Sequence, residues 1–205
     1  MAIIKSGASS DQLTIDATSK AARVTLYNSD GTYSGVKRTY RAATIDALVT
    51  ATTADVPFFL IEGSATQTIV VKRIAVSGCT LTAVAYLLVN VTKHSTAATG
   101  GTSTTLTGVP VDSTSAAATA TVKAYTAAPT AGTLVGTVAS NRTLAQATTA
   151  AAAGIPRDFV FDFGDMADTK GLVLRGTGQG VALVWGTAPA TAVTLAVDIE
   201  WTEEA

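Results

Sequence analysis

Thr194–Trp201 (TLAVDIEW) alternates large apolar side chains with small or charged ones. Successive side chains of an extended chain point to opposite sides, so this period of two places every large apolar group on one face. The members of that face are Leu195, Val197, Ile199 and Trp201. The stretch therefore predicts a half-buried β-strand.

Similar strand signatures recur upstream, each rich in β-branched or alternating residues and bounded by turn-forming residues. They are Arg23–Tyr27, Thr68–Val76, Thr80–Thr92, Thr119–Thr126, Phe159–Phe163, Gly171–Arg175 and Val181–Trp185. Helical periodicity is weak: Ala42–Ala51 could form a turn or two, and Thr143–Ala153 is alanine-rich but equally compatible with a loop or strand edge. The pattern predicts an all-β fold, a jelly-roll-like β-sandwich preceded by an extended N-terminal arm.

The composition narrows the class of protein. Alanine and threonine supply 74 of the 205 residues, and charged residues only 14%, against about 25% in an ordinary globular protein. With 47% hydrophobic residues, the chain can bury enough surface to offset its ordering entropy, which excludes charge-rich disorder. Glycine is too sparse for collagen, and no apolar run reaches the roughly 18 residues of a membrane-spanning helix.

Charge is also unevenly divided along the chain. Residues 1–45 hold six basic and three acidic residues, whereas residues 46–205 hold eight basic and twelve acidic ones. The division could be chance in a small sample. Alternatively, residues 1–45 form a basic attachment arm with a short hairpin, and residues 46–205 form the sandwich domain. The net charge of −1 gives no global field, so we expect neither nucleic acid nor a membrane as a partner.

Residues 95–141 contain only two charged residues, Asp112 and Lys123. A solvated loop normally carries more charge. The region therefore indicates either a surface that packs against another protein, where threonine hydroxyls can still satisfy backbone groups, or threonine and alanine used as ordinary strand and turn residues.

Chemically active side chains are scarce and isolated. Cys79 is the single cysteine, which excludes an internal disulfide and a cysteine zinc cluster, and we expect a small buried side chain there. His94, the single histidine, follows an apolar strand, and we expect an exposed loop residue. Gly176–Gly180 (GTGQG) lacks the lysine and helix of a phosphate-binding loop and predicts a hairpin turn. We expect no enzymatic activity, no cofactor and no metal site.

Two further groups of residues leave alternatives open. One acidic cluster consists of Asp158, Asp162, Asp165 and Asp168. Its spacing does not match an EF-hand, so a solvated face with turn-capping aspartates is favoured over a calcium site. The aromatic residues available to a carbohydrate site are Tyr86, Tyr125, Trp185 and Trp201, and each fits a strand core at least as well.

Two segments resemble proteins of tailed bacteriophages. Ile4–Asp16 (IKSGASSDQLTID), continuing through Thr18–Tyr27 (TSKAARVTLY), resembles an N-terminal segment shared by minor virion structural proteins. Gly171–Gln179 (GLVLRGTGQ), with the terminal strand ending in Trp201–Glu204 (WTEE), is similar to the C-terminal part of phage head- or tail-associated β-proteins. The middle of the chain carries no comparable signature.

The resemblance implies a non-enzymatic virion protein, made in the host bacterial cytoplasm, that decorates or cements the capsid. Its implied partners are the major capsid protein or tail components, and its implied state is a homotrimer. The basic residues that could dock the arm on an acidic virion surface are Lys5, Lys20, Arg23, Lys37, Arg38 and Arg41. Phe58 and Phe59, after Pro57, are candidate partner anchors or, alternatively, the first core strand of the sandwich.

Other functions remain open from the sequence. A tail fibre or baseplate protein that binds a host glycan would expose aromatic residues beside polar ones. A secreted bacterial carbohydrate-binding module belongs to another class, and we do not expect it here because Met1–Gly7 lacks the long apolar stretch of a secretory signal. A polysaccharide depolymerase would need paired carboxylates, for which only the acidic cluster Asp158–Asp168 is available.

Overall fold

The computed structural model describes residues 14–15, 22–23, 37–44, 47–147, 158–164 and 171–204, and within these ranges it contains strands and turns but no helix. The all-β prediction is therefore confirmed. The chain divides into two compact units, Met1–Lys37 and Arg38–Ala205. In the first unit, β1 (Thr14–Ile15) pairs antiparallel with β2 (Ala22–Arg23).

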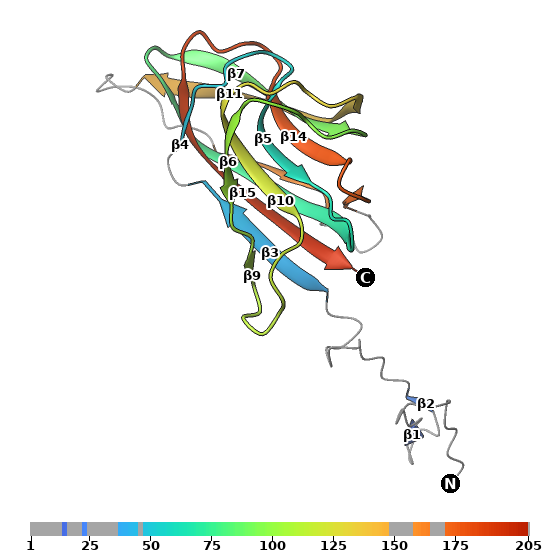
Figure 1. Cartoon of the computed structure of the whole chain (residues 1–205). Helices are drawn as coiled ribbons and strands as arrows, with labels where there is room; N and C mark the ends of the chain where they lie inside the picture. Colours follow the sequence, from blue (N-terminus) through green and yellow to red (C-terminus); the bar gives the residue numbers. More distant parts are fainter. Residues whose placement is uncertain are drawn as a thin grey trace. The chain divides into compact units, whose positions relative to one another are not determined.

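The second unit is built from thirteen described strands (Figure 1). They are β3 (Arg38–Ala43), β4 (Ala47–Val49), β5 (Pro57–Glu62), β6 (Thr68–Leu81), β7 (Ala85–His94), β8 (Thr102–Leu106), β9 (Val109–Pro110), β10 (Thr121–Ala127), β11 (Leu134–Ala147), β12 (Phe159–Asp162), β13 (Leu172–Leu174), β14 (Gly180–Trp185) and β15 (Val193–Glu204).

These strands form one continuous sheet that folds back on itself into two halves. The β5 half has the order β8-β10-β5-β14-β7-β11, and the β15 half has the order β6-β15-β3-β9, with β12 and β13 on β6 and β4 on β15. The halves join where β11 runs parallel to β6 for two residue pairs, Gln146 with Thr80 and Ala147 with Leu81. All other pairings between the named strands are antiparallel, and an isolated bridge between Ala54 and Trp185 is parallel. The chain repeatedly passes from one half to the other, as in a jelly-roll-like sandwich.

The core lies between the halves and contains two aromatic stacks. The Trp185 ring lies 4.2 Å from that of Phe58, and the Trp201 ring lies 5.8 Å from that of Tyr40. The predicted apolar face of β15 is confirmed, because Leu195, Val197, Ile199 and Trp201 are all at most 1% exposed. The predicted burial of Cys79 is also confirmed, and this burial raises the pKa of its thiol to about 11.

Two segments of the alanine- and threonine-rich region pair with each other beside the β5 half. Thr121 and His94 lie at the same end of this half, so after β10 the chain must run back before β11 begins beside His94. Residues 128–133 make this return and pair with residues 95–101, with hydrogen bonds between Thr99 and Thr130. Pro129 is buried and Ala98 packs against the core, so part of the uncharged region packs internally.

A buried carboxylate fastens the connection between β9 and β10. Glu203 is 5% exposed and accepts hydrogen bonds from the backbone N–H groups of Thr119 and Ala120, the Thr119 hydroxyl and the Trp201 indole, at 2.7 to 3.0 Å. The Tyr40 hydroxyl donates to the Ala116 carbonyl at 2.9 Å. The loop that carries these residues is therefore held at its base against the end of the β15 half.

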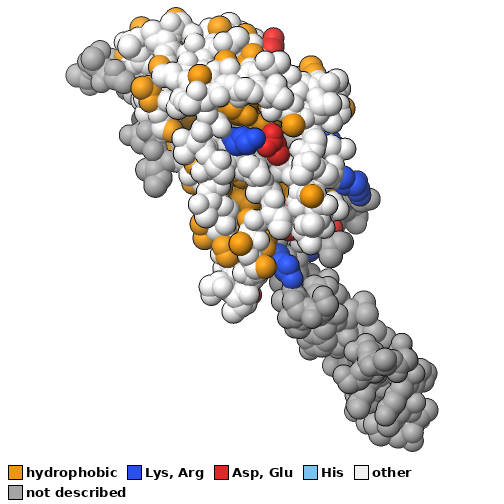
Figure 2. Space-filling view, viewed as in Figure 1, with side chains coloured by type: hydrophobic (Ala, Val, Ile, Leu, Met, Phe, Trp, Pro, Cys, Tyr) orange, Lys and Arg blue, Asp and Glu red, His pale blue; other side chains and the backbone are white. Residues whose placement is uncertain are grey.

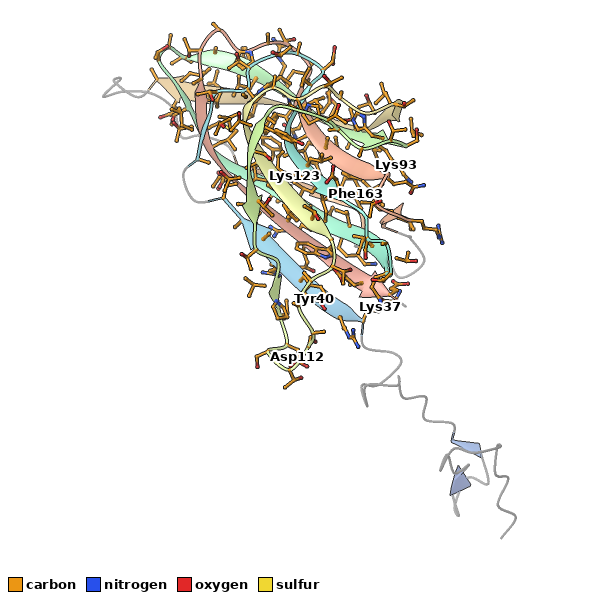
Figure 3. The ribbon with its side chains drawn as sticks, in the orientation of Figure 1. Lys37, Tyr40, Lys93, Asp112, Lys123 and Phe163 are labelled. Atoms are coloured by element: carbon orange, nitrogen blue, oxygen red, sulfur yellow. The ribbon has the colours of Figure 1, made fainter. Side chains whose placement is uncertain are left out.

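Asp112 organises the tip of the same loop (Figure 3). Its carboxylate accepts hydrogen bonds from the backbone N–H and the hydroxyl of Thr114, at 2.9 and 2.8 Å, and these bonds lower the pKa of the Asp112 carboxyl. Val109 and Val111, which flank Pro110, are 59% and 63% exposed. The loop is thus braced by hydrogen bonds while its valine side chains face solvent.

Three local predictions differ from the structure. The sandwich begins at Arg38 rather than at residue 46, because β3 pairs with β15. The helical turns expected within Ala42–Ala51 are wrong, since β3 and β4 occupy its described parts and pair with β15. Gly176–Gly180 does not join a hairpin, because β13 pairs with β6 whereas β14 pairs with β5 and β7, so the turn connects the two halves.

The prediction that His94 is an exposed loop residue is also wrong. His94 ends β7, is 4% exposed, and lies within hydrogen-bonding distance of two oxygens, the Thr92 hydroxyl at 2.9 Å and the Gly132 carbonyl at 3.0 Å. Gly132 belongs to the return segment that covers this end of the β5 half. A segment distant in the sequence therefore buries the imidazole and supplies one of its partners.

Candidate interaction surface

The predicted basic docking residues are only partly within the described chain. Lys5 and Lys20 lie outside the described residues, and for Arg23 only its place in β2 is described. Lys37 immediately precedes β3, and Arg38 and Arg41 lie on β3. The Arg41 guanidinium is 2.5 Å from the Glu200 carboxylate of the neighbouring strand. The structure thus places half of the basic set at the start of the sandwich and makes Arg41 part of a cross-strand ion pair.

Phe58 and Phe59 belong to the core, as the alternative interpretation of that stretch predicted. They are 1% and 2% exposed and lie on β5, every residue of which is buried. Phe58 stacks on Trp185, whose indole N–H donates to the Ala51 carbonyl at 2.9 Å. Rings buried in this way are not exposed for contact with a partner in this fold.

The acidic cluster is described only in part. Asp158 immediately precedes the alternating strand β12 and Asp162 ends it, and both are exposed, while Asp165 and Asp168 lie outside the described residues. The Asp162 carboxylate accepts a hydrogen bond from the Gly164 N–H at 2.9 Å, which is a turn-capping role. Among the described residues, no group of three or more His, Cys, Asp or Glu side chains is placed to hold a metal ion.

The feature that sequence reasoning missed is an exposed apolar surface along β11 and the start of β7. We call it the β11 strip and define it as Val84, Tyr86, Leu134, Val135, Val138 and Leu144. Tyr86 is 65% exposed, Val135 62% and Leu134 56%. Tyr86 lies directly opposite Leu144 in the antiparallel pairing of β7 with β11, so the two side chains share the outer face.

The local structure of β11 explains why these side chains are exposed. β11 has β7 on one side, and on its other side it pairs with β6 only at its last two residues, so most of its length is a sheet edge in the described chain. Two register shifts leave Val135 and Val138 without partners on β7. Bulges of this kind are common at sheet edges, where they twist the strand and limit further strand pairing.

The β11 strip is nearly free of charge, unlike the outer surface of the β15 half. Arg142 is the single charged residue on β11, and its guanidinium carbon lies 4.6 Å from the centre of the Tyr86 ring. On the β15 half, Arg41 pairs with Glu200, and Arg73 lies 3.6 Å from Asp198. One half therefore presents charged pairs to solvent, and the edge of the other presents aliphatic and aromatic side chains.

A second ion pair lies on the outer face of the β5 half. The Lys123 ammonium is 2.6 Å from the Glu62 carboxylate, and the two side chains are 25% and 11% exposed. Figure 2 shows a blue and a red side chain side by side where Figure 3 labels Lys123, on a face with few other charged groups. Burial raises the pKa of the nearby Tyr125. Because Lys123 and Glu62 are diagonal neighbours on paired strands, the contact is a cross-strand ion pair that holds β10 to β5.

No family model, curated protein or solved structure matches this chain. The described residues also include no helix long and apolar enough to cross a membrane. The function must therefore be inferred from the surface of the protein and from the resemblance carried by its terminal segments.

A sequence signal for the β11 strip exists but is irregular. Leu134–Ala147 (LVGTVASNRTLAQA) has apolar residues whose spacing follows neither a period of two nor one of 3.6, because the two bulges shift the register. The low charge of residues 95–141 left a contact surface and ordinary strand and turn residues both open, and the first part of β11 lies inside that range. Low charge alone could not separate the exposed strand from the segments that pack internally.

Proposed function

We propose that this protein is a non-enzymatic structural component of a tailed-phage particle that decorates or cements the capsid. The first unit, Met1–Lys37, acts as the attachment segment, and the sandwich beginning at Arg38 is the displayed domain. The resemblance of Ile4–Tyr27 to phage virion proteins supports the attachment role.

The single observation that best supports an assembly role is the β11 strip. Large apolar side chains that gather along one exposed strand favour contact with another protein, because burial of apolar surface stabilises association. Six large apolar side chains between 38% and 65% exposed lie along this edge. A protein built to pack against other virion proteins uses such a surface.

The proposal is tested on particles of the phage that encodes the chain. Particles assembled with the full chain should contain it in stoichiometric amounts by quantitative mass spectrometry, and electron microscopy should place it on the head. A chain shortened to residues 38–205 should fold, as judged by its circular dichroism, but should be lost from particles. Absence of the full chain from purified particles would refute the function, and retention of the shortened chain would refute the attachment role.

A glycan-binding tail fibre or baseplate protein is the second candidate, and one observation favours it. Tyr86 is strongly exposed, and the Arg142 guanidinium carbon lies 4.6 Å from the centre of its ring. Sugar rings stack on such aromatic faces. This function predicts binding to a host polysaccharide on a glycan array that is lost on Tyr86→Ala, whereas a capsid-decorating protein binds none.

A further inference from the structure

We propose that the outer face of the β7–β11 pair binds an acidic polysaccharide, with a sugar carboxylate on the Arg142 guanidinium and a sugar ring beside Tyr86. This inference rests on the glycan-binding function given above as the second candidate, and it names the class of glycan. Binding to acidic and to neutral polysaccharides is measured separately, so the inference can fail while that candidate function stands.

The face is formed by side chains from two neighbouring strands, which lie side by side in Figure 1. We call it the Tyr86 face and define it as Tyr86, Leu88 and Asn90 of β7 with Leu144, Arg142 and Ser140 directly opposite them on β11. Residues opposite each other in an antiparallel pair point to the same side of the sheet. The intervening Leu87 and Val89 are buried on the other side. From Tyr86 to Asn90 the face is roughly 13 Å long at about 3.3 Å per residue, which is longer than one sugar ring.

Several hydrogen-bond donors of the Tyr86 face are free. Among the described residues, the Arg142 guanidinium takes part in no hydrogen bond or ion pair. Asn90 accepts from the Ser140 hydroxyl through its Oδ1 at 2.7 Å, and its NH₂ group has no partner within the described chain. A ligand that uses these donors must be rich in acceptors, and carboxylates and sugar hydroxyls both meet that need.

The charge around Arg142 favours an anionic group on the ligand. The adjacent strands β14, β7 and β11 contain no Asp or Glu. On the β15 half, by contrast, Arg41 and Arg73 each have a carboxylate within 3.6 Å. Arg142 is therefore open to a carboxylate supplied from outside, which the planar guanidinium binds through two parallel hydrogen bonds.

Tyr86 positions the guanidinium without using its donors. The guanidinium carbon lies 4.6 Å from the centre of the Tyr86 ring. An arginine stacked on an aromatic ring meets it with its flat face, so the N–H bonds at its edge stay available. Tyr86 is still 65% exposed in this arrangement, and Leu144, 38% exposed, lies opposite it. A sugar ring packed on these two side chains has its carboxylate within reach of Arg142, and the next sugar of the polymer extends toward Asn90.

The single charge of the face argues against two other anionic polymers. A nucleic acid brings one phosphate with every nucleotide and is bound through several basic residues, whereas the Tyr86 face has only Arg142. An acidic peptide supplies carboxylates on flexible side chains and has no rigid ring for Tyr86 and Leu144. A polysaccharide supplies both the ring and the carboxylate.

The first experiment measures binding of the purified full chain to immobilised polymers by biolayer interferometry. The acidic polymers are hyaluronate, alginate, polygalacturonate and polysialate, and each is compared with its own methyl ester, which removes the negative charge and keeps the sugars. We expect binding to at least one acidic polymer, and binding to its ester that is weaker by at least about tenfold. Failure to bind any of the acidic polymers, or equal binding of acid and ester, would overturn the inference.

Two further polymers separate the possible failures. Dextran, a neutral polysaccharide, tests the glycan-binding candidate itself: if it binds and the acidic polymers do not, the candidate function stands and the inference falls. If neither kind of polysaccharide binds, both fall. Poly-L-glutamate carries carboxylates without sugar rings, and binding as strong as that of the acidic polysaccharides would assign the face to acidic peptides instead.

Variants then locate the site. Arg142→Gln and Tyr86→Ala should each weaken binding of the acidic polymer by at least about tenfold, and Arg142→Lys should recover only part of the loss because lysine lacks the guanidinium fork. The matched control is Arg73→Gln, which removes the same charge from the β15 half. Near-ultraviolet circular dichroism and thermal midpoints confirm that the variants fold. If Arg73→Gln weakens binding as strongly as Arg142→Gln, binding follows net charge and the assignment to the Tyr86 face is wrong.

Discussion

Replacing Glu203 with glutamine tests whether one buried carboxylate holds the loop between β9 and β10. The Glu203 carboxylate accepts from four donor groups, which are the backbone N–H groups of Thr119 and Ala120, the Thr119 hydroxyl and the Trp201 indole N–H. Glutamine preserves the shape of the side chain. It replaces one accepting oxygen with an NH₂ group, which can donate but cannot accept, so at least one of these donors is left facing another donor.

The expected magnitude follows from the number and kind of bonds. A hydrogen bond to a charged group contributes about 1.5–3 kcal/mol, and a buried donor left without a partner costs about 1–3 kcal/mol. Bonds that share one carboxylate are not additive. We therefore expect Glu203→Gln to lower the free energy of unfolding by about 2–4 kcal/mol.

The matched control is Glu200→Gln on the same strand. Glu200 pairs with Arg41, whose side chain is 55% exposed, and an ion pair in such a setting contributes about 0.2–1 kcal/mol. Denaturation in urea, followed by tryptophan fluorescence, gives both free energies. Hydrogen exchange of the Thr119 and Ala120 amides should accelerate in Glu203→Gln alone. If Glu203→Gln costs no more than Glu200→Gln, the loop is not held by this carboxylate.

Three further predictions concern the cover of the β5 half and the core. Gly132→Ala should lower the thermal midpoint strongly, because the new Cβ would lie 1.9 Å from the Thr96 carbonyl oxygen, whereas Gly136→Ala meets no atom within 4 Å and should be neutral or slightly stabilising by calorimetry; equal effects would contradict the packing. His94→Ala should lower the free energy of unfolding by about 2–3 kcal/mol in urea denaturation, because the hydrogen bonds of the imidazole are lost and a cavity is left. An unchanged urea midpoint would show that the imidazole is not a packed core group. At pH 8, Cys79 should react with iodoacetamide at least roughly 100-fold more slowly in the folded chain than in the urea-unfolded chain. The reason is that a pKa of about 11 keeps the folded thiol protonated until the pH approaches that value. Equal reaction rates would refute the burial of Cys79.

The fold class was predictable because the strongest strands carry their burial pattern in the sequence. The alternation of β15 and the apolar stretch at Val181–Trp185 both correspond to buried strands. The short strands β4, β8 and β9 were not predictable, because each is defined by the strand it pairs with rather than by its own composition. Local propensity is weak in strands, and pairing with distant segments decides them.

The candidate surface was less accessible from the sequence for the same physical reason. The position of His94 beside a lysine suggested an exposed loop, yet residues 128–133 return across that end and bury it. Conversely, the valines of β11 are exposed because bulges and a free edge remove them from the core. Burial of a β-strand depends on what lies over each face, and no local pattern contains that information.

The placement of β14 has a consequence for how the protein folds. In the β5 half, β14 separates the group β8-β10-β5 from the pair β7-β11, so the half is continuous only when Gly180–Trp185 is inserted between them. Of the two strands beside it, β7 ends at His94 and β5 at Glu62, which lie 86 and 118 residues before Gly180 in the chain. Such long-range closure makes folding slow, on the order of milliseconds to seconds for all-β domains. During that interval β5 and β7 each present an apolar, unpaired edge, and the newly made chain is at its most prone to aggregate until the late strand arrives.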